Sequence, residues 1–506
     1  MPAPVRRPGR PPGNRRPRGA RSLPDRVEAL RRAAAAEGSG EPANFLHALS
    51  DPDPVMRCVA AWGLGQRRDP RTRRALEAAL VDPDPRVRAL AADALGALDP
   101  PGSGAALAAA LGDPDDRVRA EAAGALAAVA DPAAVPALLN LLADRSVAVR
   151  RSVARALGPT AALGGEPGLL QLLHDPDPHV RRAAVLGLRG SPAEAVAARL
   201  RALLTDPSGR VRVAAAIVVG QRRDLAAVPA LLERLRTDSS FVRPAVLVAL
   251  GRIGDPSALG PVLAEAAGEP SWTRVCAVRA LASFGDSPEA APAARRALGD
   301  PAWSVRGAGA ETLGRIGTAA DLGALLALVE DPHPWPRRGA IYALGRLGLA
   351  EAAPRIREEL RNPSAEVRLA AIWAIGQLRD DGAIEGLVRL LRATAPAPGR
   401  PPPEPAGSRA VEPPEDPTAG EVAGEEARAR QFDSLVQALG RLAERTADPL
   451  IQRALLEARA RVGEAEGERE ARLPPPERER PGGPPSLRRL LEAALVGAAE
   501  EEGGEI

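Results

Sequence analysis

The sequence predicts an all-α fold, a right-handed α-solenoid of about twelve two-helix repeats with a 31-residue period. Two observations support this prediction. A phrase such as VDPDPRVRALAADALG, at residues 81–96, returns along much of the 506-residue chain. Hydrophobic residues make up 45% of the chain but aromatic residues only 2%, so the apolar side chains are mostly Ala, Leu and Val, which favour closely packed helices over sheets.

The period is set by the acidic or amide residue that opens each copy of the phrase. These residues follow one another at steps of 31, with a single step of 32, at Asp51, Asp82, Asp113, Asp144, Asp175, Asp206, Asp238, Glu269, Asp300, Asp331 and Asn362. A fixed period in this range indicates stacked supersecondary units.

The second helix of each repeat, helix B, begins directly after this acid. Asp84 is a suitable N-cap and Pro85 suits the first helical position. Val87, Ala91 and the Ala94–Leu95 pair then form one apolar stripe at helical spacing. Glycines follow the stripe where a helix end can require a left-handed residue, namely Gly96, Gly158, Gly220, Gly314 and Gly376.

The first helix, helix A, has its own pattern. Residues 131–142 read DPAAVPALLNLL, with a capping Asp, an early Pro and a leucine-rich stripe. One A/B pair cannot bury its own apolar face, whereas stacked pairs can, and this predicts the solenoid.

The phrase DPDPxVRxxAAxALG, together with the helix DPxAVPxLxxLL, resembles the HEAT-like repeats of the phycobilisome (PBS) lyase type, of armadillo-like fold. The resemblance covers about residues 41–391. It implies that B helices line the concave side of the solenoid. Such repeats serve scaffolds, chromophore lyases, hydroxylases and DNA glycosylase-like proteins, so the resemblance implies a fold more strongly than a function.

Composition divides the chain into six segments. We expect a disordered Arg/Pro-rich leader at residues 1–21 and an N-terminal capping helix at 22–40, followed by the repeat array at 41–393. An acidic Pro-rich insertion follows at 394–426, expected to be disordered, and then a C-terminal repeat and cap helices at 427–463. The tail, 464–506, is of low complexity except for a short amphipathic helix expected at 486–502.

One arginine recurs in every repeat, on the flank of the helix-B stripe. It lies six residues after the acid at Arg57, Arg88, Arg119, Arg150, Arg181, Arg212, Arg306, Arg337 and Arg368, and five after it at Arg243 and Arg274. We interpret this series as a structural ladder, in which each guanidinium meets an acidic turn or helix-end carbonyls while its stem packs on the next repeat.

Residues that vary between repeats identify the candidate binding face. Positions four, seven and eleven after the acid lie opposite the apolar stripe of helix B. In the second to sixth repeats they hold Arg86, Arg117, Arg151, Arg155, Arg182 and Arg210, and elsewhere Trp62, Trp335, Arg338, Tyr342 and Trp373. Trp, Tyr and Arg are typical of binding hot spots. The alternative is a merely solvated face, because all 68 basic residues of this chain are Arg.

Signals for catalysis, cofactors and metals are weak. The four histidines, His47, His174, His179 and His333, form no HExxH motif, and Cys58 and Cys276 are too isolated for a disulfide framework or zinc site. We therefore predict no catalytic residues, no metal and no cofactor. No apolar run approaches a membrane span and no secretory signal is seen, which predicts a cytoplasmic protein.

These observations predict a non-enzymatic scaffold that binds a protein or peptide, favouring acidic partners, on its concave face. The first alternative is a nucleic-acid-binding or glycosylase-like protein that uses the Arg face on phosphates and Trp to stack a base. The second is a bilin lyase-like or other modifying enzyme. The sequence leaves the partner's identity and the oligomeric state open.

Overall fold

The computed structural model describes residues 23–35, 42–98, 102–394, 431–443 and 448–458. Every regular element within these ranges is a helix, and the fold is a right-handed α-solenoid, as the sequence predicts. The chain divides into two compact units, residues 1–222 and 223–506. The leader at 1–21, most of the insertion and the expected helix at 486–502 lie outside the described residues.

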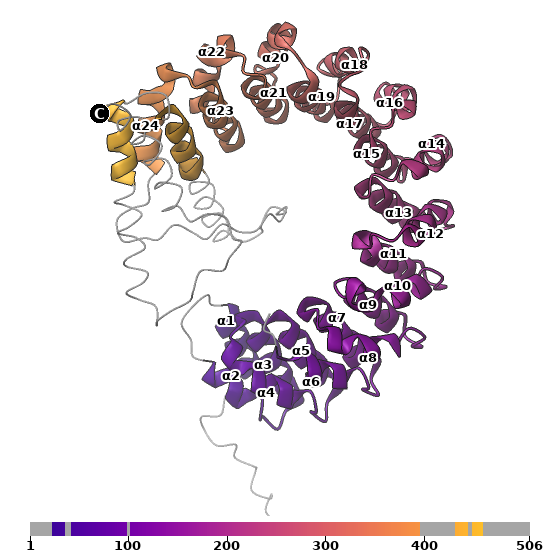
Figure 1. The fold of residues 1–506 in the computed structure, drawn as a ribbon. Coiled ribbons are helices and arrows are strands. Elements are labelled where there is room, and N and C mark those ends of the chain that lie inside the picture. The colour runs from indigo at the N-terminus through magenta and orange to yellow at the C-terminus, as the bar shows by residue number, and fades with distance from the viewer. Residues whose placement is uncertain (1–22, 36–41, 99–101, 395–430, 444–447, 459–506) are drawn as a thin grey trace, which may run out of the picture. The chain divides into compact units, whose positions relative to one another are not determined.

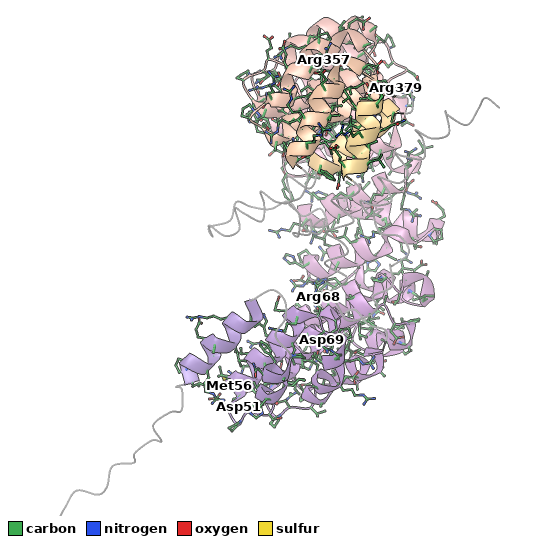
Figure 2. All side chains as sticks on the ribbon, turned by 90° about the vertical axis from the view of Figure 1, so that its left-hand side faces the viewer. Asp51, Met56, Arg68, Asp69, Arg357 and Arg379 are labelled. Atoms are coloured by element: carbon green, nitrogen blue, oxygen red, sulfur yellow. The ribbon has the colours of Figure 1, made fainter. Side chains whose placement is uncertain are left out.

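The first unit starts with α1 (Leu23–Ala35) and continues as alternating A and B helices in two layers (Figure 1). Its A helices are α2 (Ala43–Ala48), α4 (Arg73–Ala79), α6 (Gly104–Ala110), α8 (Val135–Leu139), α10 (Glu166–Leu172) and α12 (Glu194–Ala202). Its B helices are α3 (Pro54–Arg67), α5 (Pro85–Ala97), α7 (Asp116–Val129), α9 (Val147–Leu157), α11 (Pro178–Gly187) and α13 (Gly209–Gln221). Asp51 and Met56 lie at the start of α3, and Arg68 lies at its end (Figure 2).

The second unit repeats the same alternation. Its A helices are α14 (Val228–Thr237), α16 (Leu259–Ala266), α18 (Ala290–Ala297), α20 (Leu322–Leu328), α22 (Ala353–Glu358) and α24 (Ile384–Thr394). Its B helices are α15 (Arg243–Ile253), α17 (Ser271–Ala280), α19 (Trp303–Ile316), α21 (Pro334–Arg346) and α23 (Ala365–Leu378). Two further helices, at residues 431–443 and 449–458, bury Phe432, Leu435, Ile451 and Leu455 in the same core as α23.

The B helices begin where the capping pattern predicts. The Asp84 carboxylate accepts a hydrogen bond from the backbone N–H of Arg86 at 2.8 Å, and Pro85 is the first residue of α5. The stripe residues Val87, Ala91 and Leu95 have no exposed surface. The A helices are shorter than predicted, because residues 131–142 form a 3-10 turn, Pro132–Ala134, followed by α8.

The predicted role of the glycines after the stripe is wrong. Gly96 lies inside α5, and a Cβ atom there would sit 2.8 Å from the Cα of Ala125 on the next B helix. Gly314 and Gly376 make equally close approaches to Ala343 and Ala438, Gly220 lies inside α13, and Gly158 is right-handed. Gly96, Gly314 and Gly376 therefore act in helix packing, and a Cβ atom at Gly158 would lie 3.2 Å from the Cα of Gly187 on the next B helix. The left-handed helix ends are occupied instead by residues such as Arg68, Ala130, Arg379 and Gly254.

Candidate binding surface on the B helices

Arg88 on α5 shows how hydrogen bonds and an ion pair connect one repeat to the next. Its Nε and Nη2 atoms donate to the two carboxylate oxygens of Asp113, the turn acid of the following repeat, at 2.7 and 2.9 Å. Its Nη1 atom donates to the carbonyl of Asp82, in its own turn, at 2.8 Å. Burial alone would raise the pKa of Asp113, but hydrogen bonds from Arg88 and from the backbone N–H of Asp115 outweigh burial and lower that pKa.

The same two-sided contact recurs along both units. A carboxylate of the next repeat and a carbonyl of the arginine's own turn are bridged by Arg57, Arg119, Arg150, Arg181, Arg274 and Arg306. The repeated arginines of these helices therefore link neighbouring repeats, and their guanidiniums are largely occupied.

Three ladder positions differ in their contacts. Arg337 precedes a repeat that has Asn362 in place of the acid, and its Nε is buried without a hydrogen-bond partner in the described part of the chain. Arg368 donates to the carbonyl of Asn362 at 2.8 Å, whereas Arg212 keeps the regular contact, to the carbonyl of Asp206, at 2.7 Å. Arg243 pairs instead with Glu265, on a neighbouring A helix.

Helix α1 adds one more arginine–aspartate contact of this kind, which was not among the contacts predicted from the sequence. Arg26 pairs with Asp51, and α1 packs on α3 as one B helix packs on the next. The signal was present in the sequence, because Arg26 lies one period of 31 residues before Arg57. In the first unit, α1 therefore takes the place of a B helix that has no A helix among the described residues.

The six predicted face arginines of the first unit are all exposed, and the structure brings three of them together. A groove of about 870 Å³ is lined by Arg151, Arg155, Arg182, Arg189 and His179, and we call it the arginine groove. Arg86, Arg117 and Arg210 lie outside its lining, and Arg86 is paired with its own N-cap, Asp84, at 2.7 Å. Trp62, half-buried on α3, also lies outside it.

Positive charge in the arginine groove is poorly compensated. Glu166 is the acid of its lining, and it accepts a hydrogen bond from the Ser191 hydroxyl at 2.6 Å. Glu121 lies near Arg155, and burial and then the neighbouring Asp93 raise the pKa of Glu121 despite that arginine. Within the described ranges no carboxylate forms an ion pair with Arg151, Arg182 or Arg189.

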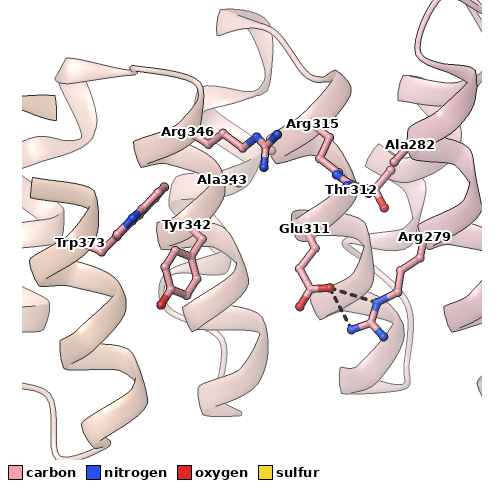
Figure 3. Close-up of a pocket in the computed structure, with 10 residues that line it drawn as sticks. Arg279, Ala282, Glu311, Thr312, Arg315, Tyr342, Ala343, Arg346 and Trp373 are labelled. Atoms are coloured by element: carbon pink, nitrogen blue, oxygen red, sulfur yellow. Dashed lines mark hydrogen bonds and ion pairs between the residues drawn. The ribbon is translucent and has the colours of Figure 1, made fainter. Parts of the chain in front are cut away.

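The second unit presents a different face. Tyr342 and Trp373 meet edge to face, with ring centroids 5.0 Å apart, in a pocket of about 360 Å³ (Figure 3). The Arg338 guanidinium lies 4.0 Å from the centre of the Trp335 ring. All four of these predicted residues are half-buried rather than exposed.

Cations on this face meet carboxylates from neighbouring repeats. Arg279 pairs with Glu311 at 2.9 Å, and Arg338 pairs with Glu366 at 3.2 Å. Arg315 and Arg346, which line the pocket from above Tyr342, were not among the predicted residues (Figure 3). Arg315 and Arg346 are 31 residues apart, so the repeat period could have identified them, whereas Arg189, in a 3-10 turn after α11, has no arginine one period before or after it.

The described residues provide little for metal or thiol chemistry. None of the ranges that the structure describes contains a group of three or more His, Cys, Asp or Glu placed to hold a metal ion. Burial raises the pKa of both the Cys58 and the Cys276 thiol, so neither is activated as a nucleophile. No helix in these ranges is both long and apolar enough to cross a membrane.

Comparisons with known proteins agree with this architecture. The model of HEAT repeats matches residues 42–123, 104–167, 148–217, 166–243, 196–275, 259–338 and 322–400. Yeast importin-beta (Kap95p) is similar in structure, with a TM-score of 0.56 and 14% identity over 94% of this chain and 68% of that one. Kap95p in its complex with Nup1 gives a TM-score of 0.54 at 14% identity, over 94% and 70% of the two chains.

A weaker likeness links the chain to a lyase. The CpcE–CpcF complex of phycocyanin lyase from Nostoc is 25% identical over 51% of this chain and 94% of that one, with a TM-score of 0.29. No curated protein matches the chain significantly. The repeat model nevertheless covers most of the sequence, from residue 42 to residue 400, with the period and two-helix unit seen in the structure. The chain therefore belongs to the family of HEAT-repeat proteins.

Proposed function

We propose that the chain is a non-enzymatic, cytoplasmic scaffold that binds an acidic protein or peptide on its helix-B face, which the resemblance implies to be concave. The observation that carries this proposal is the arginine groove. It gathers Arg151, Arg155, Arg182 and Arg189 around a single lining acid, Glu166. Guanidiniums held close together repel one another, so an anionic partner that lies between them is favoured electrostatically.

Other exposed arginines form ion pairs, and this contrast favours a binding role for the arginine groove over an explanation from base composition alone. Arg71 pairs with Asp69 at 2.8 Å and Arg86 pairs with Asp84 at 2.7 Å, although both arginines are exposed. Base composition would explain why every basic residue is Arg. It does not explain why three neighbouring arginines lie in one groove without ion pairs in the described part of the chain. Kap95p, which has the same fold, is seen in complexes with Ran and with Nup1, and this supports protein binding as the activity.

The test uses the full-length chain and a fluorescent peptide of ten glutamates, with anisotropy as the readout. Arg151→Glu/Arg182→Glu should weaken binding by at least tenfold, because both groove cations are reversed. The matched control is Arg74→Glu/Arg145→Glu, which changes the net charge equally at exposed positions outside the groove and should stay within twofold. Circular dichroism should show equal helicity for all three proteins.

Two results would refute the proposal. Equal affinity of the groove variant and the control would move the site elsewhere. Tighter, steeply salt-dependent binding of a 20-base-pair DNA duplex, lost in the groove variant, would establish the nucleic-acid alternative instead. A pull-down from the native host followed by mass spectrometry would then identify the partner itself.

A further inference from the structure

Three aromatic residues occupy one repeat position in three consecutive repeats of the second unit. Phe241, Trp272 and Trp303 each lie three residues after the acidic residue of their turn and 31 residues apart, and we call them the aromatic row. The same position holds Pro54, Pro85 and Pro178 in other repeats. Aromatic residues form only 2% of the chain, so their return at one phase of the repeat is a distinct feature of this surface.

The row is exposed, unlike the aromatic residues predicted to bind. Phe241, Trp272 and Trp303 are 61%, 59% and 44% exposed, and no other aromatic residue in the described ranges is as open to solvent. They stand at or beside the first turn of a B helix, outside the buried core. Because an exposed ring adds little to folding, this recurrence favours an interaction surface over a packing role.

One end of the row is held in a defined geometry. The Trp303 ring stacks on His333, with centroids 4.1 Å apart and planes 7° from parallel, and meets the edge of Trp335 at 6.3 Å. Gly307 makes room for this cluster, because a Cβ atom there would lie 2.4 Å from the Trp335 ring. The exposed Trp303 face is therefore fixed before any ligand arrives, which lowers the entropic cost of binding.

The charges around the row indicate the chemistry of its partner. Asp300 and Glu269 both pair with Arg274, at 2.9 and 2.8 Å. Asp331 pairs with Arg306 at 2.6 Å, so most of the charge of these turns is compensated. Arg296 is exposed and has no ion pair among the described residues, and with Glu269 it borders a depression of about 320 Å³ between two of the turns. One such cation complements a single carboxylate and is too few for a nucleic-acid backbone.

The spacing of the row matches an extended proline-rich chain. Neighbouring helices in such stacks lie about 8–10 Å apart, so we expect rings at one repeat position to follow one another at about that interval. A polyproline II helix rises about 3.1 Å per residue with three residues per turn, so every third side chain returns to one face after about 9 Å. Prolines presented at that interval stack on aromatic rings, and their preset backbone loses little entropy on binding.

We propose that the aromatic row binds a proline-rich segment of a partner protein in the polyproline II conformation, with one acidic residue of that segment paired to Arg296. This site is separate from the arginine groove and goes beyond the proposed function. Occupancy by a flat, single-stranded nucleic acid is the competing possibility, and the test below includes it.

The experiment measures binding of a fluorescent twelve-residue peptide, eleven prolines with one central glutamate, to the full-length chain at 0.15 M salt. Trp272→Ala/Trp303→Ala should weaken binding by at least tenfold, and Arg296→Ala by about threefold to tenfold. The control Leu225→Ala/Leu456→Ala removes two exposed leucines of the same unit, 62% and 54% open, and should stay within twofold. A glycine–serine peptide with one glutamate should bind at least tenfold more weakly than the proline peptide.

Each contrary result overturns the proposal. One such result is that the proline peptide does not bind the wild-type chain at millimolar concentration. A second is that the tryptophan variant binds this peptide as tightly as the wild type does. A third is that the wild type binds the glycine–serine peptide as tightly as the proline peptide. Tighter binding of a twelve-nucleotide oligothymidylate, lost in the tryptophan variant, would assign the row to nucleic acid. Arg151→Glu/Arg182→Glu should not change proline-peptide binding, so failure of the groove proposal and failure of this one are distinguishable.

Discussion

Single glycines set how closely successive B helices approach. The apolar stripes could be predicted from helical periodicity, but the role of the glycine that follows them could not. Its sequence context, at the end of a predicted helix, is the same for a left-handed cap and for a close contact. Only the position of Ala125, one repeat later, shows that Gly96 is needed for packing.

Gly96→Ala should therefore destabilise the chain although alanine is the better helix former. The new methyl group would meet the backbone of α7, and we expect overpacking of about 1–3 kcal/mol to outweigh a propensity gain of about 1 kcal/mol. Gly124→Ala is the matched control, because Gly124 lies inside α7 with no atom within 4 Å of a new Cβ. Thermal melts should show a lower Tm for the first variant and an equal or higher Tm for the second. A rise in both would contradict the packing role.

At the scale of helices, capping chemistry was the most predictable feature. An Asp and a Pro at the start of a B helix act locally, so Asp84 and Pro85 predict the start of α5 without knowledge of its neighbours. Contacts that cross repeats were less predictable. The helix at 431–443 packs Ala438 against Gly376 after a long insertion, and its buried side chains depend on that distant contact.

The helix at 431–443 carries a carboxylate that the fold destabilises. Burial raises the pKa of Asp433 to about 6, and one of its carboxylate oxygens has no hydrogen-bond partner in the described residues. A raised folded-state pKa penalises the charged form, so the penalty is complete above about pH 6 and disappears below the ordinary value of 3.8. Asp433→Asn should remove this penalty, by about 1–2 kcal/mol once partial solvent access is allowed for.

The measurement is the Tm of this variant and of the wild type between pH 4 and pH 8. The Tm difference should be largest at pH 7.5 and shrink steadily as the pH falls towards 4. Glu385→Gln, an exposed carboxylate on α24, should shift the Tm little at any pH. A pH-independent gain at Asp433 would mean that the effect comes from packing rather than from charge.

At the scale of the whole chain, the two units present different surfaces. In the first, Arg151 and Arg182 meet in a groove without ion pairs among the described residues, whereas in the second Arg279 and Arg338 are paired with Glu311 and Glu366. Helical facing predicted the same binding role for Arg151, Arg182 and Arg338, and it did not select Arg279. Facing could not predict the pairing, because each carboxylate comes from a different repeat. The aromatic row was missed for a related reason, since its position holds a helix-starting proline in four of the eleven repeats and Asp, Val, Gly or Ala in four others.

The arginine ladder also makes whole repeats interchangeable. Arg88 contacts the turn acid of the next repeat, so removing residues 113–143, one full period, would bring Arg88 to Asp144 and place Gly96 against Ala156, both equivalent to the lost partners. That shortened chain should fold with unchanged helicity per residue and a Tm within a few degrees of the wild type, since such stability is a sum of neighbour terms. Removing residues 113–129 instead would delete the turn and α7 but keep the A helices on either side, so Arg88 and Gly96 would lose their partners, and this chain should show a broad, lowered melt. If both chains melt alike, these contacts do not join the repeats. If they differ as expected, a gene encoding this array can grow or shrink by duplication and loss of single repeats, with no second mutation needed to restore the joint.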